Sequence, residues 1–383
     1  MSVEQASPDS PMEQFYRDIQ AKRMDALWRH EGGAARGPDT VTAPYEPCLW
    51  RWSDIDPAIR RAGELVQPSN DDQRRALTLN NPSVRPMGTA THTVSAAVQM
   101  VLPGETAPSH RHTMAAIRFV MRGSGAVTFI DGEGCTMQPG DLVLTPGWTW
   151  HGHINRTEGP MVWMDSLDVP LIGSLKAGLY EDYPDQLYPA TKPVDDSVRR
   201  FGGGFLRPTW DRSSSLVSPL LTFPWAQTEH ALHELAGSEV SPYDDVAFQY
   251  TNPTTGGHAL PTIGCWIQMI RPGVHTKAHR HATASIYHVF RGRGSTVVDS
   301  VQIDWQEGDF FAVPPWAWHE HANTGSGEEA VLFSTNDIPV FESLGLYREY
   351  PYEASDGYQQ VRGDYAEVYG KAAPAPGAPL HGR

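Results

Sequence analysis

Three histidines in the first half of the sequence have the spacing of ligands to a catalytic metal ion. His110 and His112 stand two positions apart, and residues two apart in a β-strand point to the same face, so they present two imidazoles together. His151 follows about forty residues later and adds a third nitrogen from another strand. Three nitrogens on one side of a metal leave positions open to substrate and oxygen, as catalytic metals require. Ordinary polar histidines often form one such pair by chance, so the pattern needs independent support.

An internal repeat supplies that support. Residues 98–155 match residues 267–323 without a break in order, and His279, His281 and His319 repeat the three histidines. The offset is 169 at the paired histidines and 168 at the late one, which indicates a one-residue deletion in a turn. Chance does not produce so long a match, so the chain contains a duplicated domain.

The segments around these histidines have the composition of short strands. From about Thr91 onward, β-rich runs alternate with Gly, Pro and Asp turns, which predicts a β-barrel or sandwich for each copy. Ser10 to Glu13 predicts the capped start of a helix that runs to about His30, and another short helix is expected near Trp225–Leu235. The expected parts are a helical arm (1–90), a first barrel (91–175), a connector (176–245), a second barrel (246–370) and a disordered tail (371–383).

The overall composition argues against several classes of function. The 383 residues suggest about two domains, and 30 basic against 45 acidic residues give a formal charge of −15. That charge argues against a nucleic-acid binder and against adsorption to anionic membranes. Cys48, Cys135 and Cys265 are far apart, so no disulfide framework or zinc-thiolate site is expected. No apolar run approaches the roughly 20 residues of a membrane span, and the first residues do not resemble a signal peptide, so we expect a cytoplasmic protein.

The motifs around the histidines resemble those of the cupin superfamily. Its first motif, G-x5-HxH, appears at residues 104–112 and again at 273–281. Its second motif, G-x5-P-x4-H-x3-N, appears at residues 140–155 and again at 308–323. The resemblance implies a mainly β bicupin, with two jelly-roll β-barrels and a helical N-terminal arm.

A closer resemblance is to the gentisate 1,2-dioxygenase family, which also holds salicylate and 1-hydroxy-2-naphthoate dioxygenases. It is carried by SHRHTMAAIRF (109–119), GDLVLTPGWTWHGH (140–153) and HRHATASIYHVF (279–290), and it extends over both repeats and most of the arm. Many cupins add a glutamate ligand four or five residues after the paired histidines. Here those positions hold Ala116 and Ile117, so the sequence fits the three-histidine subgroup.

The resemblance implies a specific reaction. One Fe(II) per subunit would be bound in the first barrel by His110, His112 and His151, and gentisate would be opened with O2 between its carboxyl-bearing and adjacent hydroxyl-bearing carbons to give maleylpyruvate. Salicylate and 1-hydroxy-2-naphthoate are alternative substrates. A non-enzymatic ligand-binding bicupin and a metal-dependent isomerase are alternative functions, and imidazole ligands also suit Mn, Zn and Cu. By the same resemblance we expect a homo-oligomer, commonly a tetramer.

Arg118 is the first candidate for binding the substrate. It has the same strand parity as His112, which predicts that both side chains point into the barrel. A buried guanidinium keeps its proton and needs an anionic partner. Either a protein carboxylate or the carboxylate of a substrate could serve, and the sequence leaves both open.

Four further residues complete the candidate site. Parity places His153 beside His151, either as a contact to the substrate or as a satisfied histidine at the mouth of the barrel. The resemblance adds Arg74, Gln99 and Asp165 as substrate-binding residues. It also makes His153 and Asp165 candidates for managing protons, since a histidine titrates near neutral pH.

The second barrel is expected to differ from the first. An offset of 169 places Tyr287 where the first copy has Arg118, which removes the expected anchor for a carboxylate. The second copy also has Glu320 beside its late histidine, and it adds His288. Its three histidines could hold a structural metal or hydrogen-bond one another with no metal. Of the two, the sequence favours no tightly bound metal.

Overall fold

The protein is represented by a computed structural model that describes residues 10–29, 37–66, 75–86, 88–204, 206–211 and 214–370. It divides into two compact units, Met1–Thr42 and Ala43–Arg383. The first unit contains helix α1 (Pro11–Ala21), where the Ser10 hydroxyl accepts a hydrogen bond from the Glu13 backbone N–H at 3.2 Å, as the sequence predicts. The helix is shorter than expected, because Arg23 adopts a positive φ of 61° and ends the helical path.

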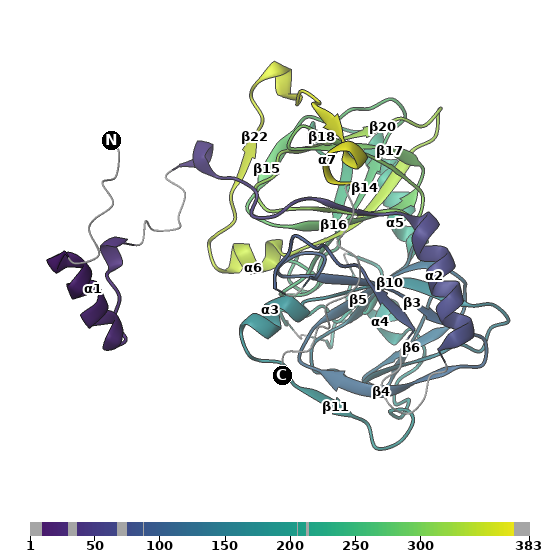
Figure 1. The fold of residues 1–383 in the computed structure, drawn as a ribbon. Coiled ribbons are helices and arrows are strands. Elements are labelled where there is room, and N and C mark those ends of the chain that lie inside the picture. Colours follow the sequence, from purple (N-terminus) through teal and green to yellow (C-terminus); the bar gives the residue numbers. More distant parts are fainter. Residues whose placement is uncertain are drawn as a thin grey trace. The chain divides into compact units, whose positions relative to one another are not determined.

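The larger unit contains two β-barrels, each built from two sheets (Figure 1). The strands of the first are β2 (Ala76–Thr78), β3 (Ser95–Val101), β4 (Thr106–His112), β5 (Ala116–Arg122), β6 (Val127–Ile130), β7 (Glu133–Thr136), β8 (Leu142–Thr145), β9 (His151–Ile154), β10 (Met161–Leu167), β11 (Tyr180–Asp182) and β12 (Thr222–Phe223). Their order is β12-β8-β5-β10-β3-β2 in one sheet and β11-β4-β9-β6-β7 in the other.

The second barrel repeats this plan. Its strands are β1 (Cys48–Trp50), β13 (Val246–Gln249), β14 (Gly264–Ile270), β15 (His279–His281), β16 (Ser285–Arg291), β17 (Arg293–Val298), β18 (Val301–Gln306), β19 (Phe310–Val313), β20 (His319–Asn323), β21 (Ala330–Asn336), β22 (Glu349–Pro351) and β23 (Gly363–Asp364). Their order is β1-β19-β16-β21-β14-β13 and β22-β15-β20-β17-β18-β23. The α-helices of the larger unit are α2 (Trp52–Leu65), α3 (Val169–Ser174), α4 (Asp196–Phe201), α5 (Trp225–Ala236), α6 (Ile338–Ser343) and α7 (Tyr365–Tyr369).

The two six-stranded sheets that contain β5 and β16 are buried on both faces. In β10, Met161 and Trp163 belong to the core of the first barrel, whereas Val162 and Met164 belong to a core that both barrels share. Successive side chains of a strand point to opposite faces, so one strand supplies both cores. Within the shared core, the ring of Phe119 from the first barrel stacks on that of Phe333 from the second, with centroids 4.1 Å apart.

The barrels meet around an approximate two-fold axis. The hydroxyls of Ser166 and Thr335, which are equivalent residues at the offset of 169, lie 3.0 Å apart. Phe119 and His288 are also equivalent residues, and their rings pack edge to face with centroids 6.0 Å apart. His288, which the second copy adds, therefore faces the shared core, where it also stacks on Phe310.

Each barrel is completed by a segment that the sequence pattern assigned elsewhere. Strand β1, which precedes the first barrel, pairs with β19 of the second, and the Trp52 backbone N–H at the start of α2 donates to Asp309 at 2.8 Å. The body of α2 contacts β2 and β3 of the first barrel. Strand β12, from the expected connector, pairs with β8 of the first barrel, and the Trp225 backbone N–H at the start of α5 donates to Asp141 at 2.7 Å. The body of α5 contacts β13 of the second barrel. The helix expected near Trp225–Leu235 is confirmed as α5, and the boundaries of the five parts remain predictions.

No helix among the described residues is long and apolar enough to cross a membrane. Arg74 and the tail expected at residues 371–383 lie outside the described residues.

Candidate metal and substrate site

Strands β4 and β9 bring the first three histidines together inside the first barrel. His110 and His112 lie on β4, and His110 is the cross-strand neighbour of His151 on β9. One side-chain nitrogen of each histidine lies within 4.8 Å of the others, and all three residues are buried. The structure thus brings the three predicted ligands close enough to bind one metal ion.

Backbone carbonyl groups determine which nitrogen of each ring is available to a metal ion. The Nδ1 atoms of His110, His112 and His151 lie 3.2, 2.8 and 2.9 Å from the carbonyl oxygens of residues 108, 114 and 149. A carbonyl can only accept, so in the neutral ring Nδ1 carries the proton and Nε2 presents a lone pair. Partners of this kind orient metal-binding histidines.

The chemistry of this donor set fits a bound cation. His151 Nε2 is buried and has no hydrogen-bond partner among the described residues. Burial, followed by the positive charges that His110 and Arg118 can carry, lowers the pKa of His151 well below its ordinary value, so its ring is neutral. A neutral imidazole with an unsatisfied, buried lone pair is the state in which histidine binds iron, zinc or copper.

Arg118 lies on β5, in the sheet opposite the histidines. Its Nε is 3.3 Å from Asp165 Oδ1, its Nη1 is hydrogen-bonded to the Thr145 hydroxyl, and its side chain is buried. Arg118 does not share a strand with His112, as the expected parity required, because β4 ends at His112 and a turn separates it from β5. The inward direction follows instead from Val120, two residues further along β5, which belongs to the core of the first barrel. Of the two partners left open for Arg118, the protein carboxylate is present.

The other described candidates also lie in the interior of the first barrel. His153 follows His151 by two residues on β9, and its Nδ1 is 2.9 Å from the Thr128 hydroxyl. Gln99 is buried on β3, on the same face as Val101 of the barrel core. Together with Arg118 and Asp165, these side chains point into the interior of the barrel that holds the histidines. The structure does not assign their roles, which remain predictions.

Tyr180 is a neighbour of the histidines that the sequence did not reveal. It lies on β11 directly across from His112, and its ring stacks on those of His110 and His112 at centroid distances of 5.3 and 6.4 Å. The ring is 40% exposed, so it lies at the edge of the site. The offset of 169 would have paired Tyr180 with Glu349, but both residues lie beyond the stretch in which the repeat is readable.

The second barrel holds an equivalent group of buried histidines, His279, His281 and His319. Glu349, on β22, places Oε1 3.2 Å from His279 Nδ1. The neighbouring Glu320 points away from this group, because its carboxylate contacts His275 and the Gln359 backbone N–H. Glu349 is thus the acidic residue at the second group, and it was missed.

The polar residues next to the histidines are not repeated in the second barrel. Strand pairing places Arg118 opposite Asp165, and the equivalent pair in the second barrel is Tyr287 opposite Ser334. Tyr287 stacks on Phe311 with centroids 4.8 Å apart, so an aromatic cluster fills the region occupied by the ion pair in the first barrel.

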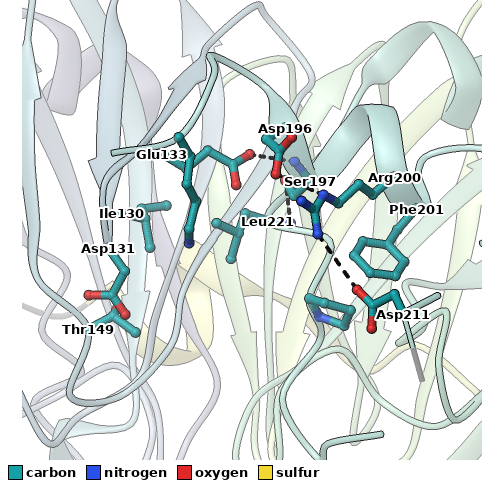
Figure 2. Close-up of a pocket in the computed structure, with 12 residues that line it drawn as sticks. Ile130, Asp131, Glu133, Thr149, Asp196, Ser197, Arg200, Phe201, Asp211 and Leu221 are labelled. Carbon is teal, nitrogen blue, oxygen red and sulfur yellow. Dashed lines mark hydrogen bonds and ion pairs between the residues drawn. The ribbon is translucent and has the colours of Figure 1, made fainter. Parts of the chain in front are cut away.

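A separate cavity of about 300 Å³ lies beside the first barrel (Figure 2). Ile130 and Glu133 line one side of it, and Arg200 and Asp211 line the other with an ion pair of 3.8 Å. None of the three histidines of the first barrel lines this cavity, so it is distinct from the candidate metal site.

Comparisons with known proteins agree with the fold. The Cupin domain family matches residues 97–169 and 266–336, which confirms the expected bicupin. The chain is 38% identical to 5-aminosalicylate 1,2-dioxygenase of Comamonas sp. over 94% of this chain and 96% of the relative. It is 34% identical to gentisate 1,2-dioxygenase 1 of Aquipseudomonas alcaligenes, covering 88% and 95% respectively. The crystal structure of salicylate 1,2-dioxygenase from Pseudoaminobacter salicylatoxidans with gentisate superposes with a TM-score of 0.83 at 32% identity, covering 91% of this chain and 96% of that one.

Proposed function

This chain belongs to the gentisate and salicylate family of ring-cleaving 1,2-dioxygenases, and from that premise we propose that it opens the ring of gentisate in its first barrel with Fe(II). The observation that carries the proposal is the buried Arg118–Asp165 pair beside three histidines whose Nε2 lone pairs converge. When bound there, iron would bring an aromatic hydroxy acid and O2 together and pass electrons between them.

Arg118 is the residue we propose to bind the carboxylate of the substrate. A guanidinium presents five N–H donors in a planar fork and can hold two carboxylates along different edges. Asp165 lies on the Nε side and Thr145 binds Nη1, so these two residues hold the fork in one orientation. The planar group thereby positions the carboxyl end of the ring, and Asp165 keeps the buried charge balanced when no substrate is bound.

His153 and Asp165 are the residues we propose to hold protons during the reaction. His153 is buried next to His151, and its Nδ1 is already engaged by Thr128, so its other nitrogen faces the barrel interior. A hydroxyl group on the substrate ring needs a nearby base when it binds as an oxyanion. Gln99, buried on β3, and Arg74 are proposed as further contacts to the substrate.

5-Aminosalicylate is the second candidate substrate. It and gentisate are both 2-hydroxybenzoates with an electron-donating group at position 5, and a relative that is 38% identical is a 5-aminosalicylate 1,2-dioxygenase. The anchor proposed above recognises the carboxyl end that the two acids share. Discrimination between them must therefore come from contacts at the opposite end of the ring.

The test is oxygen consumption by the iron-reconstituted protein. Gentisate, 5-aminosalicylate, salicylate and 1-hydroxy-2-naphthoate are compared at equal concentrations in an oxygen electrode, with the ring-opened product identified by mass spectrometry. We expect the highest kcat/KM with gentisate. Faster turnover of 5-aminosalicylate would change the assigned substrate, and no oxygen uptake with any of the four acids would overturn the proposal.

A further inference from the structure

The three histidines of the second barrel leave two lone pairs in direct contact. His279 Nε2 and His319 Nε2 lie 2.9 Å apart. His319 Nδ1 is 3.1 Å from the Ala317 carbonyl oxygen, and His279 Nδ1 is 3.2 Å from the Glu349 carboxylate. Both of these oxygens can only accept, so in two neutral rings the proton of each lies on Nδ1 and neither Nε2 has a proton to donate to the other.

Two lone pairs buried at this distance need a positive species between them. A cation that binds imidazole satisfies both atoms and also His281, whose Nδ1 lies 2.9 Å from the Thr283 carbonyl oxygen. We propose that His279, His281 and His319 hold a divalent metal ion of their own, and that Glu349 is the residue that positions His279 for it. This goes beyond the proposed function, because it needs no substrate, and it differs from the expectation that the second barrel has no tightly bound metal.

Glu349 makes this group chemically different from that of the first barrel. A carboxylate that accepts from the distal nitrogen of a metal-binding histidine fixes the orientation of the ring and increases its basicity. The equivalent position in the first barrel holds Tyr180, which has no negative charge at neutral pH, and His110 is oriented there by a neutral carbonyl. The added negative charge favours retention of a divalent cation in the second barrel.

The surroundings indicate a structural role for this metal. Tyr243 stacks on His279 with centroids 5.4 Å apart, and the aromatic cluster of Tyr287 and Phe311 replaces the charged anchor. The histidines are contributed by β15 and β20, which pair through His279 and His319 alone. A metal would therefore hold together two strands that share a single residue pair.

The first part of the test removes the first-barrel ligands by combining His110→Ala with His112→Ala. The purified variant is stripped with chelator and titrated with zinc(II), and bound metal is measured by mass spectrometry. We expect about one ion per chain in this variant and about two in the unmodified protein. Adding His279→Ala with His281→Ala should remove the remaining ion.

The second part tests Glu349 in the same first-barrel variant. Glu349→Gln should weaken zinc(II) binding about tenfold or more in competition with a chromogenic chelator. Glu353→Gln, at an exposed glutamate four positions away, is the matched control and should leave the affinity unchanged. Equal affinities for the two variants would overturn the role of Glu349.

The outcome for metal content decides the site itself. If the first-barrel variant binds no more zinc(II) than the fourfold variant, the second group holds a proton instead of a metal and the proposal is wrong. His151→Ala, measured in the same way, guards against misfolding of the double variant, and circular dichroism verifies that each protein is folded. A structural metal also predicts that zinc(II) raises the melting temperature of the first-barrel variant.

Discussion

In the first barrel, an arginine and an aspartate lie beside three histidines, whereas in the second barrel the same two positions hold Tyr287 and Ser334. Both barrels keep the three histidines, and both keep the strands that carry them. The difference shows that the three histidines and the neighbouring charged pair are separable properties of this fold. The ligands come from one sheet of the barrel, and the charged pair comes from the sheet opposite, so each can change without the other.

The largest expected effect is on ring cleavage, and it comes from removing one histidine ligand from either barrel and comparing the two variants. His151→Ala should abolish ring cleavage, because the first group then has only two imidazoles. His319→Ala, the equivalent change, should leave most ring cleavage while altering metal content or thermal stability. Steady-state oxygen uptake and metal analysis of both variants check this. Equal loss of activity would mean that both barrels are catalytic.

The next effect tests the charged anchor. Arg118→Leu should leave iron bound and lower kcat/KM about tenfold or more, because a charge-assisted hydrogen bond to a carboxylate contributes roughly 1.5–3 kcal/mol. Tyr287→Leu, at the equivalent position, should leave kcat/KM unchanged. Kinetics with gentisate and iron analysis provide the measurement. Unchanged kinetics together with lower stability in Arg118→Leu would assign Arg118 to a purely structural ion pair with Asp165.

The smallest effect concerns the contact between the barrels. Thr93 donates to the Asp337 carboxylate at 2.6 Å, and burial raises the pKa of Asp337 to about 6. Because the folded state holds this proton more tightly than the unfolded state, the stability contributed by Asp337 is greatest below its ordinary pKa of 3.8 and is lost as the pH rises towards about 6.

Thr93→Val should therefore destabilise the protein by about 1–3 kcal/mol, and by more at pH 7 than at pH 5, because the charged carboxylate depends more on its donor. Urea unfolding at the two pH values measures the change. Ring cleavage per folded molecule should not change, since Thr93 lies at the contact between the barrels. Equal effects at the two pH values would show that Asp337 keeps the same charge in the folded state at both.

The sequence predicted the repeat, the barrels and both groups of histidines, because spacing by two and a constant offset survive in the order of residues. It found Arg118 through a mistaken argument: parity does not pass through the turn after His112, but β4 and β5 lie in opposite sheets whose inner faces meet in the barrel. Glu349 was not predictable in this way. It reaches His279 through a pairing of β15 with β22 that joins residues about seventy positions apart.

The added strands were missed for a similar physical reason. Strand β1 has three residues and β12 has two, which is too short for an alternating pattern to appear. Their partners were equally hidden, since β1 pairs with a strand more than 250 positions away. Short edge strands of this kind form because a neighbouring strand pairs with them, and the local sequence contains little information about that partner.

The exchange of strands β1 and β12 between the two barrels has a consequence for how such a protein could arise. Strand β1 pairs with the second barrel and β12 with the first, and the helix after each strand begins with a hydrogen bond to an aspartate of that same barrel. Each half of the chain therefore supplies an edge strand to the barrel built mainly by the other. Two separate chains of one repeat each could make the same exchange, as a domain-swapped homodimer with a true two-fold axis. Joining two such genes end to end would convert the dimer into a single chain. One half would then be free to lose its reactive groups while the other retained them.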